Sequence, residues 1–299
     1  MTKASHSKAS LLAIWISLIS NILLTILKLV VGFLFKSPVL LADGFHNAGD
    51  VMASAAALTS MRISKRPADE DHPYGHGKAE VISSAIVSMI LGIAAIYIGI
   101  EAILALFEEP AKASVLALLT AFVSLIWKQA LYVYTMRIGR QENSKGLIAT
   151  AYDHLADVYA SGAAVIGIGL ALLGDLFDIR ILLFGDPIAG IIVSYLVLKL
   201  AYDMGKESLD ILMERTVSQQ RLDEFAALIN SFEEVKRIDR LRAREHGHYI
   251  LVDLRIGVHG GMTIQEGHDI SKKIRNLIMA KHQDVDEVLI HLNPWYEHD

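Results

Sequence analysis

Six stretches in the first two thirds of the chain are dominated by apolar side chains and predict membrane-spanning helices. Each is close to the ~20 residues that an α-helix needs to cross a bilayer. Charged side chains gather mainly between these stretches. The predicted spans are residues 10–35, 39–61, 80–107, 113–137, 147–174 and 181–205.

The pattern changes from about residue 210. Two segments, SQQRLDEFAALINSF and MTIQEGHDISKKIRNLIMAKH, have the spacing of amphipathic helices, and Thr263 with Glu266 predicts a capping box at the start of the second. VKRIDRLRARE, YILVDLRIGVH and DEVLIHLNPW alternate like strands. The order αββαβ predicts a small sheet with two helices on one face, in a ferredoxin-like or metallochaperone-like α+β domain. We therefore expect an α-helical membrane domain of six transmembrane helices at 1–209 and a cytoplasmic metal-binding and dimerisation domain at 210–299.

Composition agrees with a membrane protein. Of 299 residues, 53% are hydrophobic and only 20% are charged, which is low for a soluble chain of this length. Without cysteine, neither a disulfide framework nor a thiolate metal site is available. The net charge of −5 argues against nucleic acid as a partner. The first apolar run is too long for the core of a signal peptide, and we expect it to remain as the first span.

The distribution of lysine and arginine predicts the orientation, because positive charges gather on the cytoplasmic side. With both termini inside, nine flank the spans on the inner side: Lys3, Lys8, Arg62, Lys65, Arg66, Lys78, Arg137, Arg140 and Lys145. Three flank them on the outer side: Lys36, Lys112 and Arg180. Both termini are therefore expected in the cytoplasm.

Two of the predicted spans each contain a pair of potential metal ligands four residues apart. These pairs are His46 with Asp50, and Asp153 with Asp157. Residues four apart share one helix face, so two facing helices would supply four ligands, enough for a tetrahedral divalent-metal site. Ionisable groups inside a membrane are costly and mark ion paths, proton relays or buried pairs. The alternative is a hydrogen-bond network that only holds the helices together.

Neighbouring polar residues leave the ligand set open. Asp43 lies about one turn before His46 and is a candidate fifth oxygen ligand, proton carrier or simple polar group. His154 is a candidate to replace Asp153 as ligand. Other charged residues in the spans are expected to snorkel or to pair: Lys28, Lys128, Lys199 and Asp203.

The loop between the second and third spans, RPADEDHPYGHGKAE, contains a second candidate site. Asp69, His72 and His76 are three and four residues apart, and nearby proline and glycine residues shape a turn. These residues predict a surface metal site, with an ordinary polar loop as the alternative.

The C-terminal domain contains a third set. Asp253, His268 and His291 fall on a predicted strand, helix and strand that can converge. Scattered surface histidines are the competing interpretation.

These motifs together resemble the cation diffusion facilitator family of divalent metal transporters, over almost the whole chain. LLADGFHNAGD resembles the family's second-span motif, HPYGHGKAE its following loop, and AYDHLADVYAS its fifth-span motif. The stretch RAREHGHYILVDLRIGV, with EGHDI and VLIHLNPW, resembles the family's cytoplasmic domain. The resemblance extends to bacterial zinc/iron efflux proteins, which are homodimers that exchange metal for protons.

The resemblance implies several roles. It assigns His46, Asp50, Asp153 and Asp157 to the transport site, and implies a loop site and cytoplasmic ligands at the residues given above, with Asp253 in an acidic ligand position found in part of the family. It also implies a charged interlock at the dimer interface. The interlock residues are Lys78, Glu214 and Arg244, with Glu214 in place of an aspartate.

One departure from the family bears on the metal. Zinc-selective members usually have histidine where this chain has Asp153. One histidine and three carboxylates form a harder ligand set, which favours Mn²⁺, Fe²⁺ or Co²⁺, although His46 still suits Zn²⁺. In the C-terminal domain, Asn293 replaces an aspartate and Asp239 a histidine of some relatives, which weakens a two-metal site there.

We therefore expect a proton-coupled antiporter, in a bacterial plasma (inner) membrane, that exports Zn²⁺, Mn²⁺, Fe²⁺ or Co²⁺. The metal is its substrate and regulatory ligand, and no cofactor is expected. A membrane metalloenzyme is disfavoured, because no HExxH motif is present and a closed four-ligand site leaves no position for water. The alternative is a metal sensor or scaffold of the same fold that does not transport.

Overall fold

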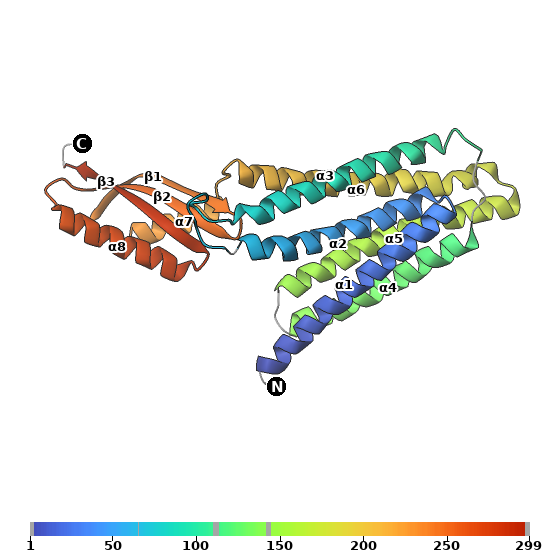
Figure 1. Ribbon diagram of the computed structural model, residues 1–299, viewed down its shortest axis with the longest axis horizontal. Coiled ribbons are helices and arrows are strands. Elements are labelled where there is room, and N and C mark those ends of the chain that lie inside the picture. Colours follow the sequence, from blue (N-terminus) through green and yellow to red (C-terminus); the bar gives the residue numbers. More distant parts are fainter. Residues whose placement is uncertain (1–2, 65, 110–113, 142–144, 297–299) are drawn as a thin grey trace. The chain divides into compact units, whose positions relative to one another are not determined.

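The computed structural model describes residues 3–64, 66–109, 114–141 and 145–296 (Figure 1). It separates into two compact units. The first contains the residues up to Ala56 together with Ile86–Gly205, and the second contains Ala57–Ala85 and the residues from Lys206 onward. The loop after the second helix therefore groups with the C-terminal domain, whereas the sequence predicted a single division near residue 210.

Long helices occupy all six predicted spans. Their bounds are α1 Lys3–Leu34, α2 Pro38–Ser64, α3 Lys78–Leu104, α4 Val115–Gln141, α5 Lys145–Phe177 and α6 Gly185–Leu212, with a short 3₁₀ helix, η1, at Arg180–Phe184. Figure 1 shows them as elongated rods. The prediction of a helical membrane domain is confirmed.

Five of the helices within the described ranges are long and apolar enough to cross a membrane. They are α1, α3, α4, α5 and the segment formed by η1 and α6. The helix that is left out, α2, carries Asp43, His46 and Asp50, and these polar side chains lower its mean hydropathy. The residues that weaken the membrane signal of α2 are thus the candidate metal ligands.

The exposed and buried side chains of the helical unit are distributed as expected for helices in a bilayer. Leu23, Ile93 and Ile166 are more than half exposed, as expected for side chains that face lipid. Small residues such as Ala42, Ala121 and other alanines fill the core between the helices, which lets the backbones approach closely. The buried polar side chains of this unit, among them Lys28, Asp43 and Lys128, are thus enclosed by closely packed helices.

The beginning of α2 is fixed by a neighbouring helix. The carboxylate Oδ1 of Asp186, in the first turn of α6, accepts a hydrogen bond of 3.0 Å from the backbone N–H of Val39. This carboxylate supplies a partner for one of the amides that a helix N-terminus leaves unsatisfied. The contact fixes the position of the helix that carries His46 and Asp50.

The C-terminal domain has the predicted order αββαβ. Its elements are α7 Gln219–Ile229, β1 Val235–His246, β2 Tyr249–His259, α8 Ile264–Lys281 and β3 Val285–Trp295. The sheet order is β1-β2-β3, with β1 antiparallel and β3 parallel to the central β2. The predicted capping box of α8 is present: Thr263 Oγ1 accepts from the N–H of Glu266, and the Glu266 carboxylate accepts from that of Thr263.

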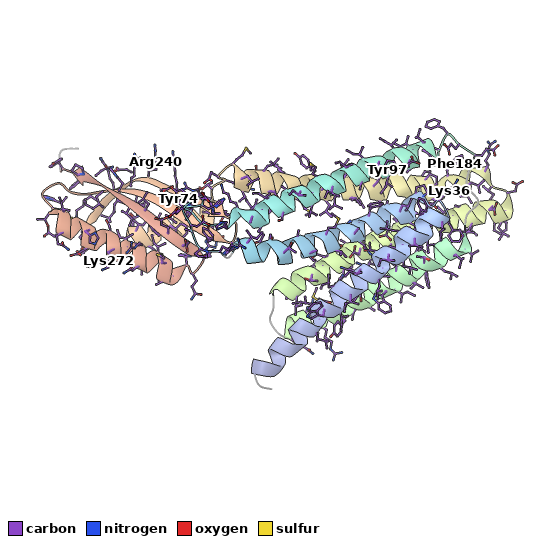
Figure 2. The ribbon with its side chains drawn as sticks, in the orientation of Figure 1. Lys36, Tyr74, Tyr97, Phe184, Arg240 and Lys272 are labelled. Carbon is purple, nitrogen blue, oxygen red and sulfur yellow. The ribbon has the colours of Figure 1, made fainter. Side chains whose placement is uncertain are left out.

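Both helices pack on one face of this sheet, as predicted. Phe225 of α7 and Ile274 of α8 are fully buried against Val252, Leu254 and other strand residues of the same parity. The other face has neither helix on it. Figure 2 shows Arg240 and Lys272 pointing away from opposite sides of the domain.

A candidate metal site inside the helical unit

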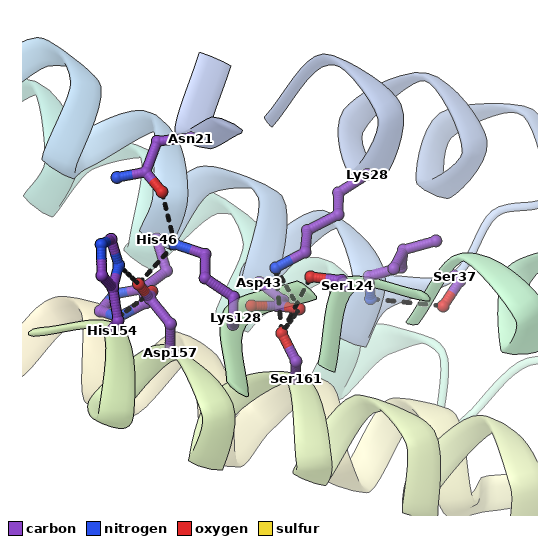
Figure 3. Close-up of polar contacts among 11 residues, drawn as sticks. Asn21, Lys28, Ser37, Asp43, His46, Ser124, Lys128, His154, Asp157 and Ser161 are labelled. Carbon is purple, nitrogen blue, oxygen red and sulfur yellow. Dashed lines mark hydrogen bonds and ion pairs between the residues drawn. The ribbon is translucent and has the colours of Figure 1, made fainter. Parts of the chain in front are cut away.

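Helices α2 and α5 bring three potential metal ligands together inside the helical unit. His46 and Asp50 lie one turn apart on α2, and Asp157 lies on α5. One ligand atom from each falls within 4.8 Å of the other two. His46 Nε2 is 3.4 Å from Asp157 Oδ1, and Asp157 is only 1% exposed (Figure 3). The three residues are thus close enough to share one ion, and their assignment as metal ligands stays a prediction.

Asp153 is the exception among the four predicted ligands. Its side chain is exposed, and its carboxylate is not part of the group that His46, Asp50 and Asp157 form. Asp157, one turn further along α5, is held by cationic and polar neighbours, whereas no ion pair of Asp153 occurs within the described ranges. The assignment of Asp153 as a ligand stays a prediction.

The two alternative ligands have other partners. His154 is buried, and its Nε2 lies 3.0 Å from Ser17 Oγ, while its Nδ1 is 3.8 Å from Asp157 Oδ2. Asp43 is completely buried, and its Oδ2 lies 2.8 Å from Lys28 Nζ and accepts a hydrogen bond from Ser161. Neither belongs to the three-residue group.

Two lysines in the spans form buried ion pairs. The sequence had left open whether they snorkel or pair. Lys28 and Lys128 are both 0% exposed, so neither snorkels to the membrane surface. Lys28 pairs with Asp43 at 2.8 Å, and Lys128 pairs with Asp157 at 2.5 Å. The sequence signal for pairing was that both lysines lie well inside predicted spans and not at their ends.

Asn47 links the two ion pairs. With its amide oriented to satisfy both neighbours, the nitrogen donates to Asp157 Oδ1 at 3.0 Å and the oxygen accepts from Lys28 Nζ at 3.2 Å. The chain of contacts then continues from Lys28 through Ser161 to Ser124 (Figure 3). Sequence reasoning did not single out Asn47, although it lies beside His46 in the same motif.

The loop residues also come together, in the second unit. Asp69 Oδ1 is 3.3 Å from His72 Nδ1, and Asp69 Oδ2 is 3.3 Å from His76 Nε2. One ligand atom from each lies within 4.8 Å of the others. The backbone N–H of His72 donates to Asp69 Oδ1 at 2.7 Å, and this hydrogen bond is the main reason that the pKa of Asp69 is lowered. A lowered pKa keeps the carboxylate in the charged form that binds metal.

Comparisons with known proteins show the family to which the chain belongs. The cation efflux transmembrane domain matches residues 14–213, and the cation efflux protein cytoplasmic domain matches residues 217–295. This chain is a cation diffusion facilitator. It belongs to a family of cation efflux transporters, which is not an enzyme family, and is a multi-pass membrane protein.

Two bacterial relatives are similar to this chain over nearly its full length. The chain is 47% identical over 282 residues to the manganese efflux system protein MneP of Bacillus subtilis, covering 94% of this chain and 95% of the relative. It is 31% identical to the manganese efflux system protein MneS of the same organism, covering 93% of each. Among solved structures, the cytosolic domain of a cation diffusion facilitator family protein is 27% identical, covers 26% of this chain and 96% of that chain, and has a TM-score of 0.25.

The residues predicted for the dimer interlock of this cation diffusion facilitator form an ion-pair network. Lys78 donates to Glu214 Oε1, and Arg244 Nε lies 2.7 Å from Glu214 Oε2. Arg244 Nη1 also donates to Asp253 Oδ2 at 2.9 Å. Asp253, predicted as a metal ligand, is thus the fourth member of this network.

The three predicted ligands of the cytoplasmic domain do not converge within one chain. Asp253 and His291 lie on β2 and β3, on the face opposite the one that α8 covers, whereas His268 lies on α8. Side chains alternate between the faces of a sheet, so His268 is separated from the other two by the strands. The expectation that the three converge is wrong for the single chain.

Asp239 and Asn293, which depart from the family pattern, bond to each other. The Asn293 amide donates to Asp239 Oδ2 at 2.6 Å, and Arg237 Nε donates to Asp239 Oδ1 at the same distance. These contacts lower the pKa of Asp239, the Asn293 hydrogen bond most of all. Both carboxylate oxygens thus have protein partners, which agrees with the weakened case for a two-metal site.

The interlock gives a pH-dependent prediction. Burial raises the pKa of Glu214, but its hydrogen bond to Lys78 and the charges of Lys78 and Arg244 outweigh burial and lower the pKa overall. A lowered folded-state pKa stabilises the fold above the unfolded value near 4.5, and this stabilisation is lost as the pH falls through the folded pKa.

We therefore expect Glu214→Gln to destabilise the chain at pH 7, by at most about 1 kcal/mol because the Glu214 side chain is 46% exposed and solvent screens its charge. Its unfolding midpoint should converge with that of the wild type as the pH falls through the lowered pKa of Glu214. Thermal unfolding from pH 3 to pH 8 checks this, with Glu233→Gln on the exposed surface as control. A gap that stays constant over this range would contradict the assignment.

Proposed function

We propose that this cation diffusion facilitator exports a divalent transition-metal cation, with Mn²⁺ as the preferred substrate, in exchange for protons. The observation that carries the proposal is the convergence of His46, Asp50 and Asp157 inside a helical membrane unit. Three ionisable ligands at such a place are costly unless they serve an ion path. Asp153, one turn from Asp157, is proposed as the fourth ligand.

The chemistry of the ligand set supports manganese. One imidazole and two or three carboxylates form a harder donor set than a site with two histidines, and harder sets favour Mn²⁺ relative to Zn²⁺. The names of the two relatives support the same metal, since MneP and MneS are manganese efflux proteins. Fe²⁺, Co²⁺ and Zn²⁺ are the competitors to be ranked.

Proton exchange follows from the ligands. A carboxylate or imidazole must be deprotonated to bind metal, so binding releases protons and acid weakens binding. If the site opens alternately to each side of the membrane, protons arriving from the outer side displace the metal. Such a cycle transports only if the two states differ in metal affinity.

The topology and assembly belong to the same proposal. The lysine and arginine distribution supports cytoplasmic termini in a bacterial plasma membrane. The match to the family's cytoplasmic domain supports a homodimer, in which Lys78, Glu214 and Arg244 stabilise the region near the interface. Metal at Asp69, His72 and His76 would then act as a regulatory ligand rather than as cargo.

The test is metal flux in proteoliposomes under an imposed pH gradient. We expect Mn²⁺ flux that depends on the gradient and exceeds that of Zn²⁺, and we expect Asp50→Ala to abolish it. The matched control is Glu101→Ala, which should retain flux. Glu101 is an exposed carboxylate on α3 and lies outside the group formed by His46, Asp50 and Asp157, called the metal group from here on. No flux of any metal from protein that still binds Mn²⁺ would favour the sensor or scaffold instead.

A further inference from the structure

The ammonium group of Lys128 lies against Asp157, one of the proposed metal ligands. Lys128 Nζ lies 2.5 Å from Oδ2 of Asp157, whose Oδ1 faces His46 Nε2 at 3.4 Å. The same Nζ donates to Asn21 Oδ1 at 2.8 Å (Figure 3). One carboxylate of the metal group is therefore already bound to a cation that belongs to the protein.

The second buried lysine, Lys28, has a partner outside the metal group. Lys28 and Lys128 are equally buried, and each has an aspartate partner. The partner of Lys28 is Asp43, which is outside the metal group, whereas the partner of Lys128 is Asp157, which is inside it. Of the two, only Lys128 contacts a proposed ligand carboxylate.

We propose that Lys128 is a tethered competitor of the metal, which holds Asp157 in the metal-free site and, when a metal binds, releases Asp157 and keeps only its hydrogen bond to Asn21. The inference rests on the proposed function, since it assumes that Asp157 binds the transported cation. It adds a positioning residue on α4 to the proposed ligands on α2 and α5.

Electrostatics requires the exchange. A divalent metal sits about 2.0–2.2 Å from a ligand carboxylate oxygen. A metal on Asp157 and an ammonium on the other oxygen of the same carboxylate would be like charges only a few ångströms apart, where little water screens them. The ammonium must therefore withdraw, and Asn21 offers it a neutral oxygen within its present reach.

The exchange has a direct consequence for transport. Asp157 is paired with a cation whether or not metal is present, so the empty carrier never leaves this carboxylate uncompensated inside the membrane. The same competition weakens metal binding and speeds metal release. Lys128 would thus set both the affinity and the turnover of the site.

The experiment measures Mn²⁺ binding to the purified full-length chain at pH 7. A background of His72→Ala and His76→Ala removes the loop site, and the binding lost on adding Asp50→Ala defines the membrane site. We expect Lys128→Met to lower the Kd of this site about tenfold or more, the scale of a lost competing ion pair. Lys128→Arg, which keeps the charge, and Lys28→Met, the matched buried lysine, should each change it less than about threefold.

Asn21→Leu provides an independent test, because it leaves Lys128 in place and removes the neutral oxygen that remains its partner once the metal has taken Asp157. We expect it to raise the Kd for Mn²⁺ about threefold or more. A structural role for Lys128, or a general field effect of its charge, predicts no change in this variant. This arm decides the question if Lys128→Met does not fold.

Flux separates this inference from the proposed function. Lys128→Met should lower both the KM and the maximal rate of Mn²⁺ flux, because the metal binds more tightly and leaves more slowly. An unchanged or raised Kd in folded Lys128→Met, or an unchanged Kd in Asn21→Leu, overturns the competitor role while wild-type flux still supports the transporter. Shifted Kd values without wild-type flux support the competitor and overturn the transporter.

Discussion

Asp157→Ala is expected to abolish metal flux and to destabilise the helical unit at the same time. Asp157 is the most connected residue of the metal group, since its oxygens contact His46, Lys128 and, through the amide of Asn47, the second ion pair. Removing it takes away a proposed ligand and leaves the Lys128 ammonium buried without its counter-charge. Breaking a buried pair from one side costs about 3–5 kcal/mol.

The double variant Asp157→Ala with Lys128→Met separates the two effects. Removal of both charges should restore most of the lost stability, because no unpaired ion remains, but it should not restore flux. The apparent unfolding midpoint in detergent measures the first effect and Mn²⁺ flux in proteoliposomes the second. Retained flux in Asp157→Ala would remove Asp157 from the transport site.

Gly247→Ala is expected to detach the loop that carries Asp69, His72 and His76 from the C-terminal domain. Gly247 joins β1 to β2 with φ of +74°, a conformation that costs an alanine about 1–2 kcal/mol. A Cβ at this position would also lie 2.1 Å from the backbone oxygen of Gly77, at the end of the loop. The atoms that this Cβ would meet are all backbone atoms of Gly77, so either the turn or the loop must move.

Other contacts also hold the loop against this turn, among them a hydrogen bond between the backbone of Gly75 and His246. Tyr249, the first residue of β2, donates its hydroxyl hydrogen to the backbone oxygen of Tyr74. The loop carries His72 and His76, so its displacement should weaken Mn²⁺ binding at the loop site and lower the unfolding midpoint. Metal titration in an Asp50→Ala background measures the first effect, and thermal unfolding the second.

The matched control for this change is Gly261→Ala. Gly261 also lies in a turn, just after β2, but a Cβ there would meet only His259 side-chain atoms at 3.4 Å. It should therefore leave both the midpoint and loop-site binding close to those of the wild type. Equal effects of the two substitutions would show that the close approach of Gly77 and Gly247 does not hold the loop.

The contrast between Asp153 and Asp157 shows how far spacing along one helix predicts a site. Residues four apart on one helix share a face, and this rule brought His46 and Asp50 to one side of α2. The rule treats Asp153 and Asp157 alike, yet only Asp157 points into the group. Asp157 has partners on α2 and α4, His46 and Lys128, and helical spacing within α5 carries no information about them.

The sequence by itself determined the six helices, the αββαβ domain and, apart from Asp153, which residues lie together in the two candidate metal groups. These depend on apolar periodicity, on helical spacing and on a short loop, and all of these are local along the chain. Tertiary structure decided which cation pairs with which carboxylate, and it placed Asp253 beside Arg244 and His268 across the sheet from His291. Such contacts join residues far apart in the chain, and their geometry is set by how the helices and strands pack.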